Sequence, residues 1–176
     1  SGSDIVLRRM RRLHSIDRYK KIIDKIKSST RDISLTTDII VGFPGEAEAD
    51  FEDTIKLVKY CKYDSAYIFK YSPRPGTPAY EMFDDVPPAE KTRRFRDLES
   101  IQKGIQAENL NRYIGQTLTV LAEKRSAKSE KDLTGHSTCH RVVNFAANQM
   151  FLGRVVDVKI TEVKSNSLYG KGVSLV

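Results

Sequence analysis

The spacing of apolar residues predicts a helix followed by a buried strand in the first part of the chain. Apolar positions recur at helical spacing from about Ile16 to Ser28, with Ser15 placed to cap the helix. The next stretch, Ile33–Phe43, instead contains three consecutive β-branched residues at positions 39–41. Such a core is typical of a parallel strand that is buried on both faces.

The same alternation of helix and strand repeats downstream. A second helix is expected over Glu48–Tyr60 and a second strand over Ala66–Tyr71. Pro87 and Pro88 then introduce a long amphipathic helix over Ala89–Asn111. Helices and strands that alternate across short connections predict right-handed βαβ units on a parallel sheet.

Beyond Gly115 the period changes from helical to alternating. Thr117–Glu123 alternates with period two, Arg125–Asp132 is polar, and further strand patterns cover residues 141–145, 153–163 and 168–173. We expect a small five-stranded barrel over residues 113–176. Residues 1–112 supply two clear strands, whereas a closed β/α barrel takes about 250 residues. They are therefore expected to form part of a β/α (TIM-like) barrel, which gives an α/β fold class overall.

Charge adds a second division to this picture. The net charge of +7 combines +7 in residues 1–31, −4 in residues 32–112 and +4 in residues 113–176. Both ends could face a polyanion, although a basic face can also be merely solvated. No run approaches ~18 uninterrupted apolar residues, so we expect no membrane span and a cytoplasmic protein.

Two loops that follow the expected strands carry the candidate chemistry. Gly42-Phe43-Pro44-Gly45-Glu46 ends the first strand, where ligands bind in parallel α/β folds. Its glycines either admit a ligand to the backbone or only supply unusual backbone angles. In the second loop, Pro73 and Pro75 flank Arg74, which favours contact with a carboxylate or phosphate over a structural salt bridge.

Other polar residues leave alternatives open. Asp38, in an otherwise apolar strand, could accept a hydrogen bond from a ligand or satisfy a neighbouring strand. In the β part, aromatic residues accompany basic and amide side chains, either as barrel core or as an RNA surface. The basic and amide side chains are Arg141, Asn144, Arg154, Lys159 and Lys164. Cys61 and Cys139 are interpreted as unmodified thiols, and the three histidines show no metal-ligand spacing, so we assign no metal site.

Four strings in this sequence resemble one known family. They are Thr37–Glu46, Tyr71–Ala79, Arg141–Phe145 and Lys164–Leu168, and the opening Ser1–Arg12 is similar to a further segment of the same family. In order and spacing, they resemble the MiaB-type radical S-adenosylmethionine (SAM) tRNA methylthiotransferases. The resemblance implies the carboxyl-terminal portion of a radical-SAM barrel followed by a TRAM domain, a small RNA-binding β-barrel.

The resemblance also implies a reaction and its cofactors. Members of this family convert isopentenyl-adenine beside the tRNA anticodon into its 2-methylthio form, using SAM and two [4Fe-4S] clusters. The C-x3-C-x2-C motif of the radical cluster is absent from this sequence. We therefore expect a missing amino-terminal half of the same polypeptide, and no activity from this chain alone. Catalytic residues cannot be assigned from the sequence.

Site residues follow from the matched motifs. The resemblance implies SAM contacts at Asp38, Gly42, Phe43, Gly45, Glu46 and Arg74, and RNA contacts at Arg141, Asn144, Arg154 and Lys164. A departure from the family is Ala47, where a hydroxyl residue often caps the following helix. Three alternatives stay open: methylthiolation of a ribosomal-protein aspartate, methylthiolation of threonylcarbamoyl-adenine, and a non-catalytic RNA-binding module.

Overall fold

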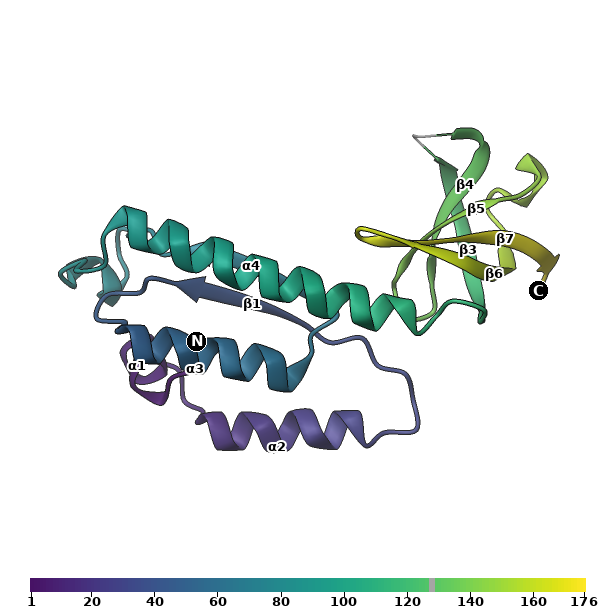
Figure 1. Ribbon diagram of the computed structural model, residues 1–176. Helices are drawn as coiled ribbons and strands as arrows, with labels where there is room; N and C mark the ends of the chain where they lie inside the picture. The colour runs from purple at the N-terminus through teal and green to yellow at the C-terminus, as the bar shows by residue number, and fades with distance from the viewer. Residues whose placement is uncertain (127–128) are drawn as a thin grey trace. The chain divides into compact units, whose positions relative to one another are not determined.

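Two parallel strands joined by a helix organise the first part of the chain (Figure 1). The computed structural model describes residues 1–126 and 129–176, and the chain folds into two units, Ser1–Ile105 and Gln106–Val176. In the first unit, β1 (Thr36–Val41) pairs in parallel with β2 (Ser65–Lys70), and α3 (Glu48–Cys61) connects them. This confirms the expected βαβ arrangement.

Helices cover one face of this two-stranded sheet. They are α2 (Ile16–Lys27), α3 and α4 (Pro88–Asn111), which run alongside β1 in Figure 1, whereas α1 (Asp4–Arg9) precedes α2. The hydroxyl of Ser15 accepts a hydrogen bond from the Arg18 N–H and caps α2 as expected. Apolar side chains from β1, α2, α3 and α4 share one core, which includes Ile23, Ile39, Val41, Phe51, Val58 and Leu98.

The helix after β1 begins without a hydroxyl cap. Ala47 occupies the cap position, and its methyl side chain cannot accept a hydrogen bond. The Asp50 carboxylate instead accepts from the Ala47 N–H at 2.9 Å, and Glu48 and Asp50 place negative charge in the first turn. These acids favour the helix dipole, so half of a capping box compensates for the missing hydroxyl.

A closed barrel of five strands forms the second unit. In spatial order the strands are β3 (Thr117–Ser126), β4 (Ser129–Ser137), β5 (Val142–Ala146), β7 (Ser167–Leu175) and β6 (Val155–Lys164). Strands β5 and β7 pair in parallel, and the other neighbours are antiparallel. Alternate side chains fill the interior, among them Val120, Leu133, Val143, Phe145, Val156, Ile160 and Leu168. The expected five-stranded barrel is confirmed.

Strand β4 corrects the expectation for residues 125–132. The sequence predicts a polar stretch there without strand character, but β4 begins at Ser129; residues 127 and 128 lie outside the described part of the chain. Within β4, Leu133 and Gly135 face the interior, and a Cβ on Gly135 would collide with the Leu121 carbonyl. Because β4 contributes only one large apolar side chain to the interior, its sequence shows little of the apolar–polar alternation by which a strand is predicted.

The boundary between the two units lies inside α4. The first unit ends at Ile105, whereas the sequence places the domain boundary after residue 112, where α4 has ended. None of the described helices combines the length and the hydropathy needed to cross a membrane.

Candidate functional site

The uncovered face of the sheet carries a carboxylate beside two aromatic rings. In the parallel register, Asp38 lies beside Tyr67, and Phe69 follows two positions later on β2, so the three side chains project from the same face. Tyr67 is 64% exposed and Phe69 52% exposed, whereas Ile39 and Val41 on the other face are buried. Asp38 is exposed as well, which corrects the expectation of a strand buried on both faces. This face is an open surface suited to a flat, partly polar ligand.

The loop after β1 is a tight turn whose glycines are packed against other side chains. Gly42 and Gly45 have φ values of +71° and +76°, in the left-handed region. A Cβ on Gly42 would collide with the side chain of Lys91, and one on Gly45 with the guanidinium of Arg9. The structure therefore favours the interpretation that these glycines supply unusual backbone angles. The space beside each glycine, through which a ligand could approach, is already filled by a side chain of the protein.

Glu46 is held inside this loop rather than presented at its surface. Its side chain is fully buried and accepts from the Gly42 N–H at 2.5 Å and from Arg94 Nη1 at 2.9 Å. Burial raises the pKa of Glu46, and the hydrogen bonds from Gly42 and Arg94 partly offset this effect. Glu46 therefore fixes the turn, and the SAM contact predicted for it gains no support from this geometry.

Arg94 is the buried partner of that carboxylate. Besides Glu46, it binds Glu90 at 2.8 Å and Glu48 at 3.3 Å, and it is 5% exposed. Burial acts to lower the pKa of the Arg94 guanidinium, but its bonds with Glu46 and Glu90 raise it above the usual value. The guanidinium is thus permanently charged, and its positive charge compensates the negative charges of the carboxylates that surround it.

Phe43 and Tyr71 join the two strand-end loops. Phe43 is buried and packs edge to face against Tyr71, with ring centroids 5.1 Å apart. The Tyr71 N–H donates to the Val41 carbonyl, and its hydroxyl donates to the Ala79 carbonyl at 2.8 Å. Phe43 is consequently a packing residue of the rim, and its side chain is not exposed to a ligand.

Arg74 lies in the exposed loop that follows β2. Its carbonyl accepts hydrogen bonds from the Thr77 N–H and hydroxyl, which closes the turn between Pro73 and Pro78. Within the described residues, its guanidinium forms no ion pair or side-chain hydrogen bond. Arg74 is therefore available to an anionic group, and its contact with a ligand stays a prediction.

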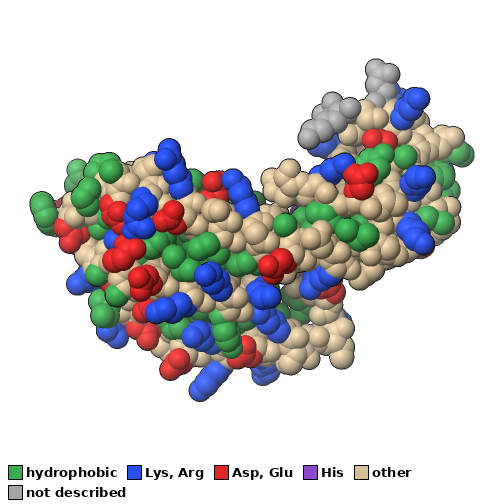
Figure 2. Space-filling model, in the orientation of Figure 1, with side chains coloured by type: hydrophobic (Ala, Val, Ile, Leu, Met, Phe, Trp, Pro, Cys, Tyr) green, Lys and Arg blue, Asp and Glu red, His purple; other side chains and the backbone are tan. Residues whose placement is uncertain are grey.

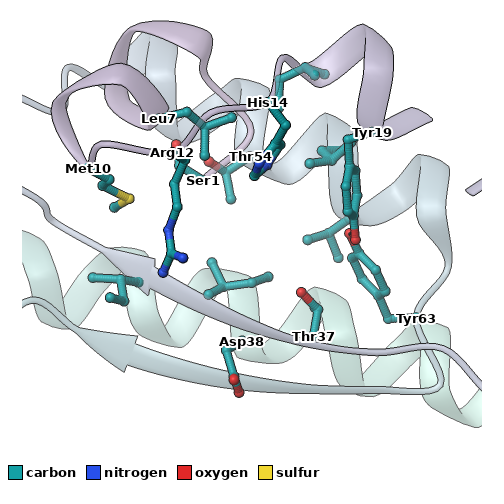
Figure 3. Close-up of a pocket in the computed structure, with 15 residues that line it drawn as sticks. Ser1, Leu7, Met10, Arg12, His14, Tyr19, Thr37, Asp38, Thr54 and Tyr63 are labelled. Atoms are coloured by element: carbon teal, nitrogen blue, oxygen red, sulfur yellow. The ribbon is translucent and has the colours of Figure 1, made fainter. Parts of the chain in front are cut away.

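A cleft of about 290 Å³ runs along the edge of β1 that is not paired with β2 (Figure 3). Arg12, His14 and Tyr19 line it from the segment 12–19, and Tyr63 lies opposite, with the Tyr19 and Tyr63 hydroxyls 2.8 Å apart. Figure 3 shows the side chain of Asp38 pointing away from the other labelled side chains. Asp38 and Ile40, which belong to the open sheet face, are nevertheless among the residues that line the cleft, so the cleft and the sheet face meet at β1.

The two thiols of the chain belong to different units. Cys61 is buried in the core of the first unit, where burial raises the pKa of its thiol, and Cys139 belongs to the barrel unit. Across residues 1–126 and 129–176, no cluster of three or more His, Cys, Asp and Glu side chains could hold a metal ion. Two thiols are also fewer than the thiolates that an iron-sulfur cluster takes, so the cysteines of this chain supply no complete set of cluster ligands.

On the barrel, two exposed lysines lie directly opposite each other. Lys159 of β6 pairs with Lys171 of β7, and the neighbouring Val158 and Gly170 positions face the interior. Like charges at such a position are unfavourable unless an anion lies between them. Figure 2 shows several Lys and Arg side chains on the visible surface of the barrel unit. The lysine pair is a candidate phosphate contact.

Two of the side chains predicted to contact RNA make contacts within the barrel unit. Arg141 is 7% exposed, and its guanidinium lies 4.7 Å from the ring centroid of Tyr113. The amide of Asn144 accepts from the Thr134 hydroxyl at 2.6 Å and contacts the Ser167 hydroxyl at 3.2 Å. For Arg141, this burial argues against a phosphate contact by the guanidinium.

Arg154 and Lys164 are exposed, as an RNA contact requires. Arg154 precedes β6, and Lys164 ends it. Lys164 forms an ion pair with Glu162, and its ammonium lies 5.7 Å from the ring centroid of Tyr169. Together with the lysine pair, Arg154 and Lys164 are exposed basic side chains distributed along β6 and β7. Their contact with RNA stays a prediction.

Sequence reasoning missed Tyr67, Phe69, Lys91, Arg94 and Lys171. The two aromatic residues alternate along β2, a signal that points to one sheet face once the strand is placed. Arg94 lies 48 positions from its partner Glu46, and the pairing of Lys171 with Lys159 depends on strand register. No local pattern reveals contacts of this kind.

Comparison with known proteins assigns both units. Residues 1–58 match the radical SAM superfamily, and residues 111–173 match the TRAM domain. Curated relatives named tRNA-2-methylthio-N(6)-dimethylallyladenosine synthase align with nearly the whole chain. Those from Buchnera aphidicola and Chromobacterium violaceum are 42% and 45% identical over 97% and 99% of this chain.

A further relative of the same name, from Cronobacter sakazakii, is 46% identical over 97% of the chain. The aligned region is 36–39% of the length of these three relatives. The chain thus spans little more than a third of the curated relatives it matches. The similarity covers both units in one continuous alignment.

Proposed function

Since the chain belongs to the MiaB-type radical SAM methylthiotransferases, we propose that it supplies part of the cofactor site and the RNA-binding barrel of a tRNA methylthiotransferase. The observation that carries this proposal is a radical SAM segment and a TRAM domain joined in one chain. The named relatives, similar throughout, favour N6-dimethylallyladenosine in tRNA as the substrate. A tRNA substrate also favours a cytoplasmic location.

We assign SAM to the open sheet face and the adjoining loops. The exposed carboxylate of Asp38 can accept from the cofactor's ammonium or hydroxyl groups, and Tyr67 and Phe69 can pack against its adenine. Arg74, exposed after β2, can pair with the carboxylate of the cofactor. SAM, when bound, supplies the radical precursor and the methyl group; the residues of this chain bind and orient it.

The iron-sulfur clusters of the family require thiolates other than those of this chain. Cys61 is buried among apolar side chains, and Cys139 lies in the other unit. We therefore assign no cluster ligand here. The contribution proposed for these residues is to bind the cofactor and the RNA.

The barrel is the proposed tRNA contact. Lys159, Lys171, Arg154 and Lys164 are exposed, and each can neutralise a backbone phosphate. Arg141 and Asn144 support the strands that present these side chains. Phosphate contacts position the RNA without reading its sequence, so the substrate base must be selected elsewhere on the enzyme.

The test is the activity of a full-length enzyme that carries these residues. After anaerobic cluster reconstitution it is incubated with SAM and one of three substrates: tRNA containing dimethylallyladenosine, tRNA containing threonylcarbamoyl-adenine, or the ribosomal protein. We expect the 2-methylthio nucleoside to form from the first substrate. Turnover on another substrate alone would refute the substrate assignment, and tRNA binding without turnover on any would favour a non-catalytic RNA-binding module.

A further inference from the structure

Lys91 of α4 contacts both strand-end loops and is almost completely buried. Its side chain is packed against Gly42 of the first loop, where a Cβ would collide with it. Its ammonium lies 5.0 Å from the ring centroid of Tyr71 in the second loop. The residue as a whole is 6% exposed. A lysine is rarely buried to this extent unless it is paired.

The partner of Lys91 comes from a third segment. Asp84 accepts from the Lys91 ammonium through both carboxylate oxygens, at 2.7 and 2.5 Å. The next residue, Asp85, accepts from the Gly45 N–H at 2.6 Å, and Arg9 donates to the Gly45 carbonyl. Residues 84–85 thus hold the first loop directly and also fix the lysine that lies under it.

The two loops are also in direct contact above Lys91. Tyr71, over the lysine, packs against the buried ring of Phe43. The contacts of Gly42 with Lys91, of Lys91 with Tyr71 and of Tyr71 with Phe43 therefore form a closed ring. Such a ring lets neither loop move without disturbing the other.

From this geometry we propose that Lys91 is a positioning residue that couples the two strand-end loops, so that Asp38 and Arg74 meet SAM in a fixed relative arrangement. This inference takes from the proposed function that SAM is the ligand bound here. The coupling itself is a property of the chain and can be measured without a ligand. A misplacement of about 1 Å in a binding group can reduce activity by about 100-fold, so loosening the loops has a measurable effect.

The test compares Lys91→Met with Lys103→Met. Methionine keeps an unbranched apolar side chain and removes the charge, and Lys103 lies on the same helix in an exposed ion pair with Glu99. Hydrogen exchange of this chain is measured for the Gly42 and Tyr71 amides. We expect exchange at both loops to accelerate together in Lys91→Met and to stay unchanged in Lys103→Met. Asp84→Asn, which leaves Lys91 in place, should give a smaller change in the same direction.

The second readout is the affinity for SAM of a full-length enzyme that carries these residues, measured well below the melting temperature of each variant. We expect the Kd for SAM, and the KM, to rise about tenfold or more in Lys91→Met with a smaller change in kcat. A lowered melting temperature with unchanged loop exchange and unchanged Kd would overturn the proposal. Loosened loops with an unchanged Kd would also overturn it. If the unsubstituted enzyme binds no SAM, the proposed cofactor site is refuted. Hydrogen exchange alone would then decide whether Lys91 couples the two loops.

Discussion

Arg94 Nη1 donates to both the carboxylate and the main-chain carbonyl of Glu46, each at 2.9 Å. This double contact, between residues that are both almost fully buried, fixes the turn in which β1 ends. Breaking one member of such a pair leaves the other charge buried without compensation, which is strongly destabilising. The rim of the first unit is therefore built from buried charge as well as from apolar packing.

Substituting Gly42 tests how closely this turn is packed. Gly42→Ala should destabilise the first unit by about 2–4 kcal/mol, from left-handed strain and a collision with Lys91. Gly76→Ala is the matched control, because Gly76 also has a positive φ but has open space around it; its cost should be about 1–2 kcal/mol. Denaturant unfolding followed by helical circular dichroism measures both. Equal losses would show that Lys91 yields to the new methyl group.

The ion pairs of Glu90 predict how stability depends on pH. Hydrogen bonds from Arg93, and then from Arg94, lower the pKa of Glu90 to about 2 from its usual 4.5. Its contribution to stability is therefore complete above about pH 4.5 and is lost as the pH falls towards 2. Glu90→Gln should lower the melting temperature at pH 6 and have a smaller effect at pH 3. Glu99→Gln, on the same helix, is the control, and an effect of Glu90→Gln that is independent of pH would contradict the assignment.

The lysine pair of the barrel predicts opposite effects on stability and binding. Lys171→Gln relieves repulsion from Lys159, so the barrel should become slightly more stable, by a few tenths of a kcal/mol. The same substitution should weaken tRNA binding and reduce its salt dependence by about one phosphate contact. Filter binding across a range of salt concentrations and thermal denaturation measure the two effects. Unchanged salt dependence would remove Lys171 from the RNA surface.

Arg141 makes the contrasting case. Because its guanidinium is buried against Tyr113, Arg141→Ala should lower the melting temperature of the barrel. The salt dependence of tRNA binding, measured below that temperature, should be unchanged. A reduced salt dependence with full stability would instead restore the phosphate contact predicted from the sequence.

Much of the fold follows from local patterns, because local patterns reflect one-sided burial. The helical spacing around Ile23 and the β-branched run at positions 39–41 locate α2 and β1 to within a few residues. Strand β4 was not predicted because Leu133 is its one large interior side chain. Gly135, the next interior position, has no side chain and lets the neighbouring strand approach closely. A pattern of apolar residues cannot mark a position that packing requires to be empty.

The candidate site was harder to predict, because the matched motifs combine exposed residues, Asp38 and Arg74, with residues that pack inside the protein. Gly42, Phe43 and Glu46 belong to a recognisable motif, yet they face the protein's own side chains. Tyr67 and Phe69 belong to no motif, and only the register of β2 against β1 places them beside Asp38. Sequence reveals which loop matters, whereas the direction of each side chain depends on tertiary contacts.

The most direct test of the proposed division between cofactor and RNA is a crossed binding experiment. In a full-length enzyme that carries these residues, calorimetry gives the Kd for SAM and filter binding the Kd for tRNA. Both are measured for Asp38→Asn and Arg154→Gln, two exposed positions. We predict that Asp38→Asn weakens SAM binding and leaves tRNA affinity unchanged, and that Arg154→Gln does the reverse. Loss of both affinities in each variant, or of neither, would contradict the assignment of SAM to the sheet face and of tRNA to the barrel.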